Sequence, residues 1–116
     1  MKNTLKLSSG DLFIAGPFFN ASTDIYGASG IADILVQNEL GWDAAAVGNH
    51  EFDAGPGTFA SLIAPNADIQ GVGIDPNTGY TGTLFPYLST NLDYSTDDSN
   101  LIIWWFLMGS LLNPIA

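Results

Sequence analysis

Hydrophobic and polar positions alternate at two different periods along the chain, which predicts short strands separated by helices. Leu5 and Leu7 lie two residues apart in a stretch of mixed polarity, and this period predicts a strand over Asn3–Ser9. Trp42–Val47 is a short run of mostly small apolar residues, which is typical of a buried parallel strand. Phe85–Asp93 again alternates at period two and is the third predicted strand.

The period changes to that of a helix in two segments between these strands. Asp24–Leu40 is predicted to be a helix that ends at Gly41, because one face repeats at i, i+3, i+4 and i+7. The positions on that face are Ile31, Ile34, Leu35 and Asn38. Pro56–Ile63 is predicted to be a shorter helix, because proline fits the first helical position and the apolar residues share one face. Those apolar residues are Phe59, Leu62 and Ile63.

The order strand, helix, strand, helix, strand indicates the α/β class with a mainly parallel sheet. Asn66–Thr83 interrupts this order with a stretch rich in Gly, Asp, Asn, Pro and Thr that has no sustained period. Such a stretch predicts a surface loop, and its Asp68 and Asp75 are expected to be solvated.

Composition narrows the class of protein. The 116 residues suffice for one domain, and 47% of them are hydrophobic. With 12 acidic against 2 basic residues the net charge is −10, which excludes nucleic-acid binding through a basic surface. The aromatic content of 12% is too high for a disordered acidic tail, and the absence of cysteine excludes disulfides and thiolate zinc sites.

The two ends of the chain differ from the segment between them. The first ten residues contain no continuous apolar stretch, so no signal peptide is expected there. Residues 99–116 form a hydrophobic tail, whose core Leu101–Leu112 is uncharged but shorter than the roughly 20 residues of a spanning helix. Two interpretations of this tail stay open, a buried element and a membrane-facing segment. The favoured interpretation is a terminus that is foreign to the preceding domain.

Polar clusters follow the first two predicted strands. Gly10 and Asp11 come after the first, and the sequence GNHEFD, residues 48–53, comes after the second. Because sites in parallel sheets form at the carboxyl ends of strands, the two clusters are expected to converge. Carboxylate and amide oxygens suit divalent cations and an imidazole can protonate a leaving group, so the set predicts metal-assisted phosphate-ester hydrolysis. Taken singly, such residues are more often turn residues or ordinary hydrogen-bonding groups.

The sequence GNHEFD after an apolar strand, preceded by SGDLF, resembles the calcineurin-like metallophosphoesterases. The stretches GDLFIAGPFFNAS, LGWDAAAVGNHEFDAG and FPYLSTNLDYS fit the bacterial 5′-nucleotidase-like branch (bifunctional metallophosphatases) in family order. The resemblance implies that residues 1–98 are a partial catalytic domain. The implied fold is a fragment of the four-layer α/β/β/α sandwich with mainly parallel strands.

The resemblance also implies roles for individual side chains. Asp11 would bridge two divalent metal ions, which in the family are Mn, Zn, Fe or Ca, and Asn49 would bind one of them through its side-chain oxygen. His50 would be a catalytic group near the phosphate, and Asp53 would pair with its ring and orient it. Glu51 is commonly present in the family without an agreed catalytic role. The implied substrate is a phosphate ester such as a nucleotide, and the implied location is periplasmic or extracellular.

Two motifs of the family are absent. The sequence has no Asp-x-His motif before Gly10 and no Gly-His-x-His motif, and His50 is its only histidine. Asp11 and Asn49 alone cannot build a two-metal site. The chain is therefore expected to be an incomplete version of the enzyme, and it stays open whether it is active alone or whether self-association supplies further ligands.

A second hypothesis comes from a different class of protein. The chain would be a non-catalytic acidic binding or assembly module, whose acidic residues bind calcium weakly. The aromatic residues Trp104, Trp105 and Phe106 of the tail would then face a partner or a membrane.

Overall fold

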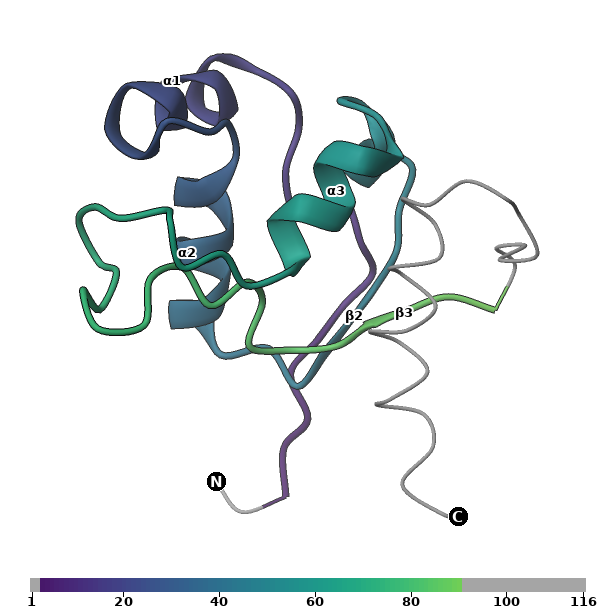
Figure 1. The fold of residues 1–116 in the computed structure, drawn as a ribbon. Coiled ribbons are helices and arrows are strands. Elements are labelled where there is room, and N and C mark those ends of the chain that lie inside the picture. Colours follow the sequence, from purple (N-terminus) through teal and green to yellow (C-terminus); the bar gives the residue numbers. More distant parts are fainter. Residues whose placement is uncertain (1–2, 91–116) are drawn as a thin grey trace, which may run out of the picture.

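The computed structural model describes residues 3–90, which form a small α/β unit (Figure 1). Its elements in chain order are β1 (Leu7–Ser8), α1 (Pro17–Tyr26), α2 (Ile31–Leu40), β2 (Ala44–Ala46), the 3-10 turn η1 (His50–Phe52), α3 (Pro56–Ile63) and β3 (Tyr87–Leu88).

The strands form a three-stranded parallel sheet in the order β1-β2-β3. Leu7 pairs with Ala44, and Ala45 pairs with Tyr87. The α/β class and the parallel sheet predicted from the sequence are therefore confirmed, and the arrangement is consistent with a fragment of an α/β sandwich. The strands are much shorter than predicted. β1 covers two of the predicted residues 3–9, and Leu5 and Leu7, which were expected to define its apolar face, are 74% and 61% exposed.

The single helix predicted over residues 24–40 is wrong at residues 27–30, where the chain leaves the helical conformation. The structure has two helices there, because Gly27 ends α1 at φ 71° and Gly30 precedes α2 at φ 78°. Both values lie in the left-handed region, which a helix interior cannot contain. A Cβ on Gly30 would also collide with the ring of Phe19, so the two helices pack closely at their junction. α1 itself was not predicted, although Pro17 stands at its first position.

The second half of that helix and the following elements agree with the sequence pattern. Ile31 and Ile34 are buried, and the Asn38 amide donates to the Gly82 carbonyl and accepts from the Leu84 backbone N–H. β2 lies inside the predicted strand 42–47, and α3 has the predicted bounds. β3 lies inside the predicted strand 85–93, of which residues 91–93 are outside the described part of the chain.

The core is built around the aromatic ring of Phe59 on α3, which is fully buried. Its centroid lies 4.9 Å from that of Tyr87, 5.7 Å from Phe52 and 6.1 Å from Phe13, all with edge-to-face geometry. Figure 1 shows the helices gathered on one side of the sheet. Tyr87 is buried on that side, whereas its neighbour Leu88 is 42% exposed.

Residues 66–83 form the predicted surface loop, with one buried anchor. Asp68 and Asp75 are exposed, as expected. Tyr80, however, is buried, pairs with Asn66 in an isolated antiparallel bridge and donates its hydroxyl to the Leu62 carbonyl. Burial raises the pKa of the Tyr80 hydroxyl. Tyr80 thus fixes this end of the loop to α3, and Figure 1 shows the loop lying beside α2.

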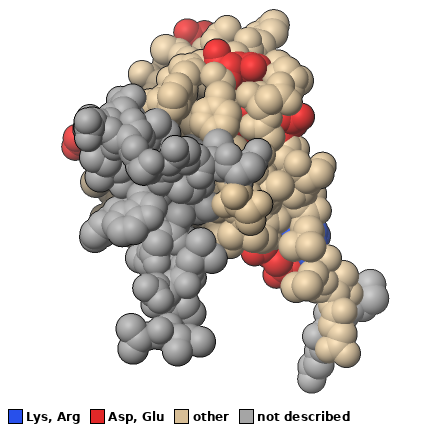
Figure 2. Space-filling view, turned by 90° about the vertical axis from the view of Figure 1, so that its right-hand side faces the viewer, with Lys and Arg blue, Asp and Glu red and all other residues tan. Residues whose placement is uncertain are grey.

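The acidic composition is visible on the surface. The face in Figure 2 carries red acidic atoms at several points and blue basic atoms at one small place. No helix within residues 3–90 has the length and apolar character needed to cross a membrane. The hydrophobic tail predicted for residues 99–116 lies outside the described residues.

The central place of Phe59 gives a stability prediction. Phe59→Ala removes a fully buried ring and is expected to lower the free energy of unfolding by about 3–5 kcal/mol. Phe18→Ala is the matched control, because Phe18 is 61% exposed, and its effect should stay within about 0.5 kcal/mol. Urea denaturation followed by circular dichroism measures both values. Equal effects of the two substitutions would contradict this description of the core.

Candidate functional site

The site lies where the loop after β1 touches the loop after β2, at the carboxyl ends of both strands. Gly10 and Gly48 meet backbone to backbone, and a Cβ on Gly10 would lie 2.6 Å from the Gly48 nitrogen. Gly10 also has a φ of +97°, which L side chains rarely adopt. The convergence of the two polar clusters that the sequence predicts is therefore confirmed.

Asp11 is the first polar side chain of the site. Among residues 3–90 it is the single non-glycine residue with positive φ, at 54°. Its Oδ1 accepts a hydrogen bond from the His50 backbone N–H at 3.0 Å, across 39 residues of sequence. The side chain is exposed, so it lies at the surface of the cluster where a ligand can reach it.

Asn49 immediately precedes His50 and caps the start of η1. It is exposed, and its side-chain amide makes no hydrogen bond with any residue that the structure describes. Asp11 and Asn49 thus offer hard oxygen atoms of the kind that divalent cations prefer. Within residues 3–90 there is no group of three or more His, Cys, Asp or Glu placed to hold a metal ion. The described ligands would therefore be only part of a metal site.

His50 and Asp53 form a pair within one turn of η1. Asp53 Oδ2 lies 2.8 Å from His50 Nδ1, and the imidazole side chain is 38% exposed. The hydrogen bond to Asp53 raises the pKa of His50 above its ordinary value of 6.5, and the nearby charges of Asp53, Asp11 and Glu51 act in the same direction. The ring is therefore oriented by a carboxylate and held in its charged form to a higher pH.

Glu51 is a member of the cluster to which the sequence assigned no role. It is 1% exposed, and its two carboxylate oxygens accept hydrogen bonds from the backbone N–H groups of Asp11, Leu12 and Gly48. Its place inside the motif GNHEFD was visible in the sequence, but its burial depends on the loop after β1, which is distant in sequence.

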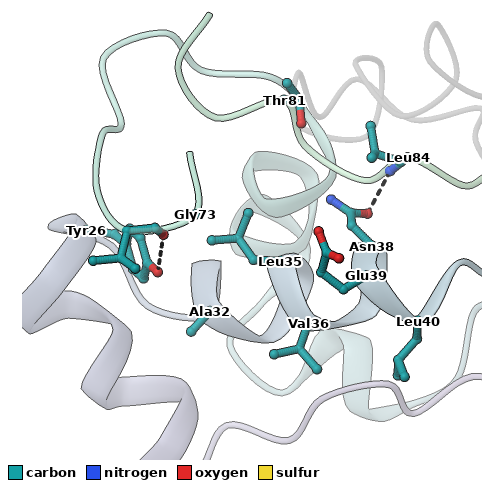
Figure 3. Close-up of a pocket in the computed structure, with 11 residues that line it drawn as sticks. Tyr26, Ala32, Leu35, Val36, Asn38, Glu39, Leu40, Gly73, Thr81 and Leu84 are labelled. Atoms are coloured by element: carbon teal, nitrogen blue, oxygen red, sulfur yellow. Dashed lines mark hydrogen bonds between the residues drawn. The ribbon is translucent and has the colours of Figure 1, made fainter. Parts of the chain in front are cut away.

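A cavity of about 440 Å³ lies elsewhere, between α2 and residues 72–84 (Figure 3). Its lining is mainly apolar and includes Leu35, Val36 and Leu84. Two of its lining residues are joined by a hydrogen bond, which the Tyr26 hydroxyl donates to the Val72 carbonyl at 2.8 Å. The cavity shares no residue with the cluster around Asp11 and His50, so the sequence-predicted residues do not line it.

The contact between the two loops predicts a difference between two glycines. Gly10→Ala and Gly27→Ala both place a side chain at positive φ, but only Gly10 has neighbouring atoms within 4 Å of the added Cβ. Backbone strain of about 1 kcal/mol is expected for both, and Gly10→Ala should lose at least about 1–3 kcal/mol more through overpacking. Thermal unfolding of the two variants measures the difference. A Gly10→Ala variant as stable as Gly27→Ala would contradict the close approach of the loops.

The pair of His50 and Asp53 predicts a pH dependence. The folded-state pKa of His50 is raised, so its contribution to stability is present below about 6.5 and is lost as the pH rises through the raised value. Asp53→Asn should lower the pKa of His50 toward 6.5. The chemical shifts of the imidazole protons, followed by NMR as a function of pH, measure the pKa of His50 directly, because the sequence contains a single histidine. Asp68→Asn, a substitution in the exposed loop, should leave the titration unchanged, and an equal shift in both variants would contradict the pairing.

Comparison with known proteins gives one informative similarity. No protein-family model and no solved structure matches the chain. The chain is 31% identical over 97 residues to the trifunctional nucleotide phosphoesterase protein YfkN of Bacillus subtilis strain 168. The match covers 82% of this chain, which spans about 6% of the length of that relative. The chain is thus similar to a short segment of a nucleotide phosphoesterase, and this similarity supports the resemblance to nucleotidase-like phosphoesterases at the level of the family.

Proposed function

We propose that this chain is part of the catalytic domain of a metal-dependent nucleotide phosphoesterase of the calcineurin-like, 5′-nucleotidase-like kind. The observation that carries the proposal is the contact between the loops after β1 and β2, where the His50 backbone N–H donates a hydrogen bond to Asp11 Oδ1 at 3.0 Å. The same loops contain the motifs that resemble the family. The similarity to a protein named as a nucleotide phosphoesterase supports a nucleotide as the substrate.

Asp11 and Asn49 would hold the metal. Asp11 uses Oδ1 to accept the His50 N–H, and its Oδ2 has no hydrogen bond with any residue from 3 to 90. The Asn49 side chain is similarly without a hydrogen bond in that part of the chain. Both groups therefore have oxygen atoms available to a cation. A divalent ion bound there would supply a Lewis acid for the phosphoryl oxygens and an activated water.

His50 would act on the phosphate itself. A protonated imidazole donates hydrogen bonds and offsets the negative charge that develops on the phosphoryl group or on the leaving oxygen. Because Asp53 accepts from Nδ1, the other ring nitrogen is the one that would face the substrate. The raised pKa of His50 keeps it protonated at higher pH than a free histidine. Asp53 would orient the ring without touching the substrate.

The remaining metal ligands are proposed to come from outside residues 3–90. Asp11 and Asn49 are too few for a complete coordination shell, and the relative is far longer than the matched segment. A second copy of the chain is another source of ligands. The alternative of a non-catalytic binding module gains no support from residues 3–90, and its aromatic tail lies outside them. Export to the periplasm or medium stays a prediction.

Binding of Mn²⁺ to the purified chain tests the proposal. Asp11→Asn removes the carboxylate charge at the metal and is expected to weaken Mn²⁺ binding at least about tenfold, as does Asn49→Ala. Isothermal titration calorimetry, or electron paramagnetic resonance of free Mn²⁺, measures the affinity. Asp68→Asn is the control for charge, because Asp68 is an exposed acidic residue of the loop 66–83 and is expected to leave the affinity unchanged.

Turnover separates the role of the metal ligands from that of the histidine. Where the parent chain, alone or with a second copy, releases phosphate from AMP with Mn²⁺, His50→Ala is expected to abolish that turnover, while the Mn²⁺ affinity of the variant stays within about twofold of the parent. A chain that does not bind Mn²⁺, or binds it equally well after Asp11→Asn, would contradict the proposed metal site.

A further inference from the structure

The buried carboxylate of Glu51 is the polar group that the proposed chemistry leaves unused. We infer that Glu51 is the positioning residue of the site: it binds the backbone of the loop after β1 and thereby fixes the orientation of Asp11 relative to Asn49 and His50. The inference deepens the proposed function and rests on it for the role of Asp11 as a metal ligand. Its geometric part, the control of the Asp11 backbone, stands on the contacts of Glu51 alone.

The carboxylate joins three amides from two distant segments. Glu51 Oε2 accepts from the Gly48 N–H at 2.7 Å and from the Asp11 N–H at 3.0 Å, and Oε1 accepts from the Leu12 N–H at 2.8 Å. Asp11 and Leu12 lie 40 and 39 residues away from Glu51 in sequence. Both oxygens are therefore engaged, and each of them reaches the loop after β1.

The contacts require both the charge and the length of glutamate. A carboxylate is an acceptor at both oxygens, whereas the amide of glutamine has one acceptor and one donor group. A glutamine at this position would turn its NH₂ toward at least one backbone N–H and leave that donor unpaired. An aspartate keeps two acceptors but is shorter by one methylene group, so it is not expected to reach all of the amides.

The buried charge of the Glu51 carboxylate is compensated mainly by backbone N–H groups. Glu51 is 1% exposed, and an unpaired charge in such a position is costly. Among residues 3–90 the only lysine is Lys6, which donates its ammonium group to the Leu40 carbonyl instead. The backbone N–H groups are thus the hydrogen-bond partners of the carboxylate, and its charge also interacts favourably with protonated His50. Such charge-assisted hydrogen bonds are among the stronger ones in proteins.

Fixing the two amides determines the backbone of Asp11. This residue has a φ of 54°, a conformation that costs free energy for any residue other than glycine and persists only where the surroundings hold it. The hydrogen bonds on either side of the Asp11 φ and ψ angles, at its own N–H and at the Leu12 N–H, are those that Glu51 accepts. Releasing them frees the backbone that directs the Asp11 carboxylate.

Amide hydrogen exchange of the purified chain, measured by NMR, tests the inference without any metal. Glu51→Gln is expected to accelerate exchange about tenfold at the amide left unpaired, with smaller changes at the other two amides, and to shift the Asp11 resonances. Glu51→Asp retains the carboxylate and is the second variant if glutamine prevents folding; it should expose at least one of the same amides. Leu62→Ala is the control, since Leu62 is a buried core residue, and it should accelerate exchange throughout the core without singling out these amides.

Mn²⁺ affinity provides the second readout. Glu51→Gln is expected to weaken Mn²⁺ binding about tenfold or more, whereas Leu62→Ala should leave it unchanged at a temperature where both variants are folded. Unchanged exchange at Asp11, Leu12 and Gly48 in the Glu51 variants would overturn the inference. So would faster exchange at these amides combined with Mn²⁺ affinity equal to that of the parent. Absence of Mn²⁺ binding by the parent itself would instead overturn the proposed function, and the exchange data would still decide whether Glu51 controls the Asp11 backbone.

Discussion

The contact between the loop after β1 and the loop after β2 is the constraint on which the site depends. Two glycine backbones, Gly10 and Gly48, approach so closely that a Cβ on Gly10 would lie 2.6 Å from the Gly48 nitrogen. The buried carboxylate of Glu51 then binds amides on both sides of this contact. Because of these interactions, groups from distant parts of the sequence occupy one end of the sheet. The short strands alone, two or three residues each, would not hold them there.

The contact between the two loops also gives the neighbouring residues His50 and Glu51 different roles. Glu51 faces inward and is 1% exposed, whereas the adjacent His50 has 38% of its side chain exposed. One turn of 3-10 helix, η1, therefore presents a histidine to solvent and buries a glutamate against the other loop. The partner of the His50 ring is local in sequence, because Asp53 directly follows η1, whereas the His50 backbone N–H is bound by Asp11 of the other loop.

The sequence predicted the alternation of strands and helices, but it did not predict α1 or η1 and placed the limits of several elements wrongly. The helix Pro56–Ile63 and the strand around Ala45 follow from local patterns, since an apolar face and a short apolar run are properties of neighbouring residues. The break between α1 and α2 could not be predicted from such local patterns. It depends on left-handed Gly27 and Gly30 and on the packing of Phe19 against Gly30, which is a tertiary contact. The burial of Tyr80 could not be predicted either, because its hydroxyl binds the Leu62 carbonyl, a contact with a residue outside its own loop.

For the candidate site, the motifs located the exposed polar groups but not what supports them. The resemblance of the GD and GNHEFD motifs to a known family pointed to Asp11, Asn49 and His50, and their place at the carboxyl ends of parallel strands predicted that they converge. The structure brings Asp11 and His50 into a hydrogen bond. The function of these residues stays a proposal. Glu51 could not be found in the same way, because a glutamate in a polar loop is usually solvated and only the three-dimensional contact with Asp11 and Leu12 reveals its burial.

The most direct test of the proposed metal site is a crystal structure of the chain grown with Mn²⁺, with the metal located by its anomalous scattering. An anomalous peak is expected within bonding distance of the Asp11 carboxylate and the Asn49 side-chain oxygen, beside a His50 ring that remains paired with Asp53. A map with no peak at these oxygens, or with Mn²⁺ bound only at the exposed acidic residues of the loop 66–83, would show that the two loops do not form a metal site.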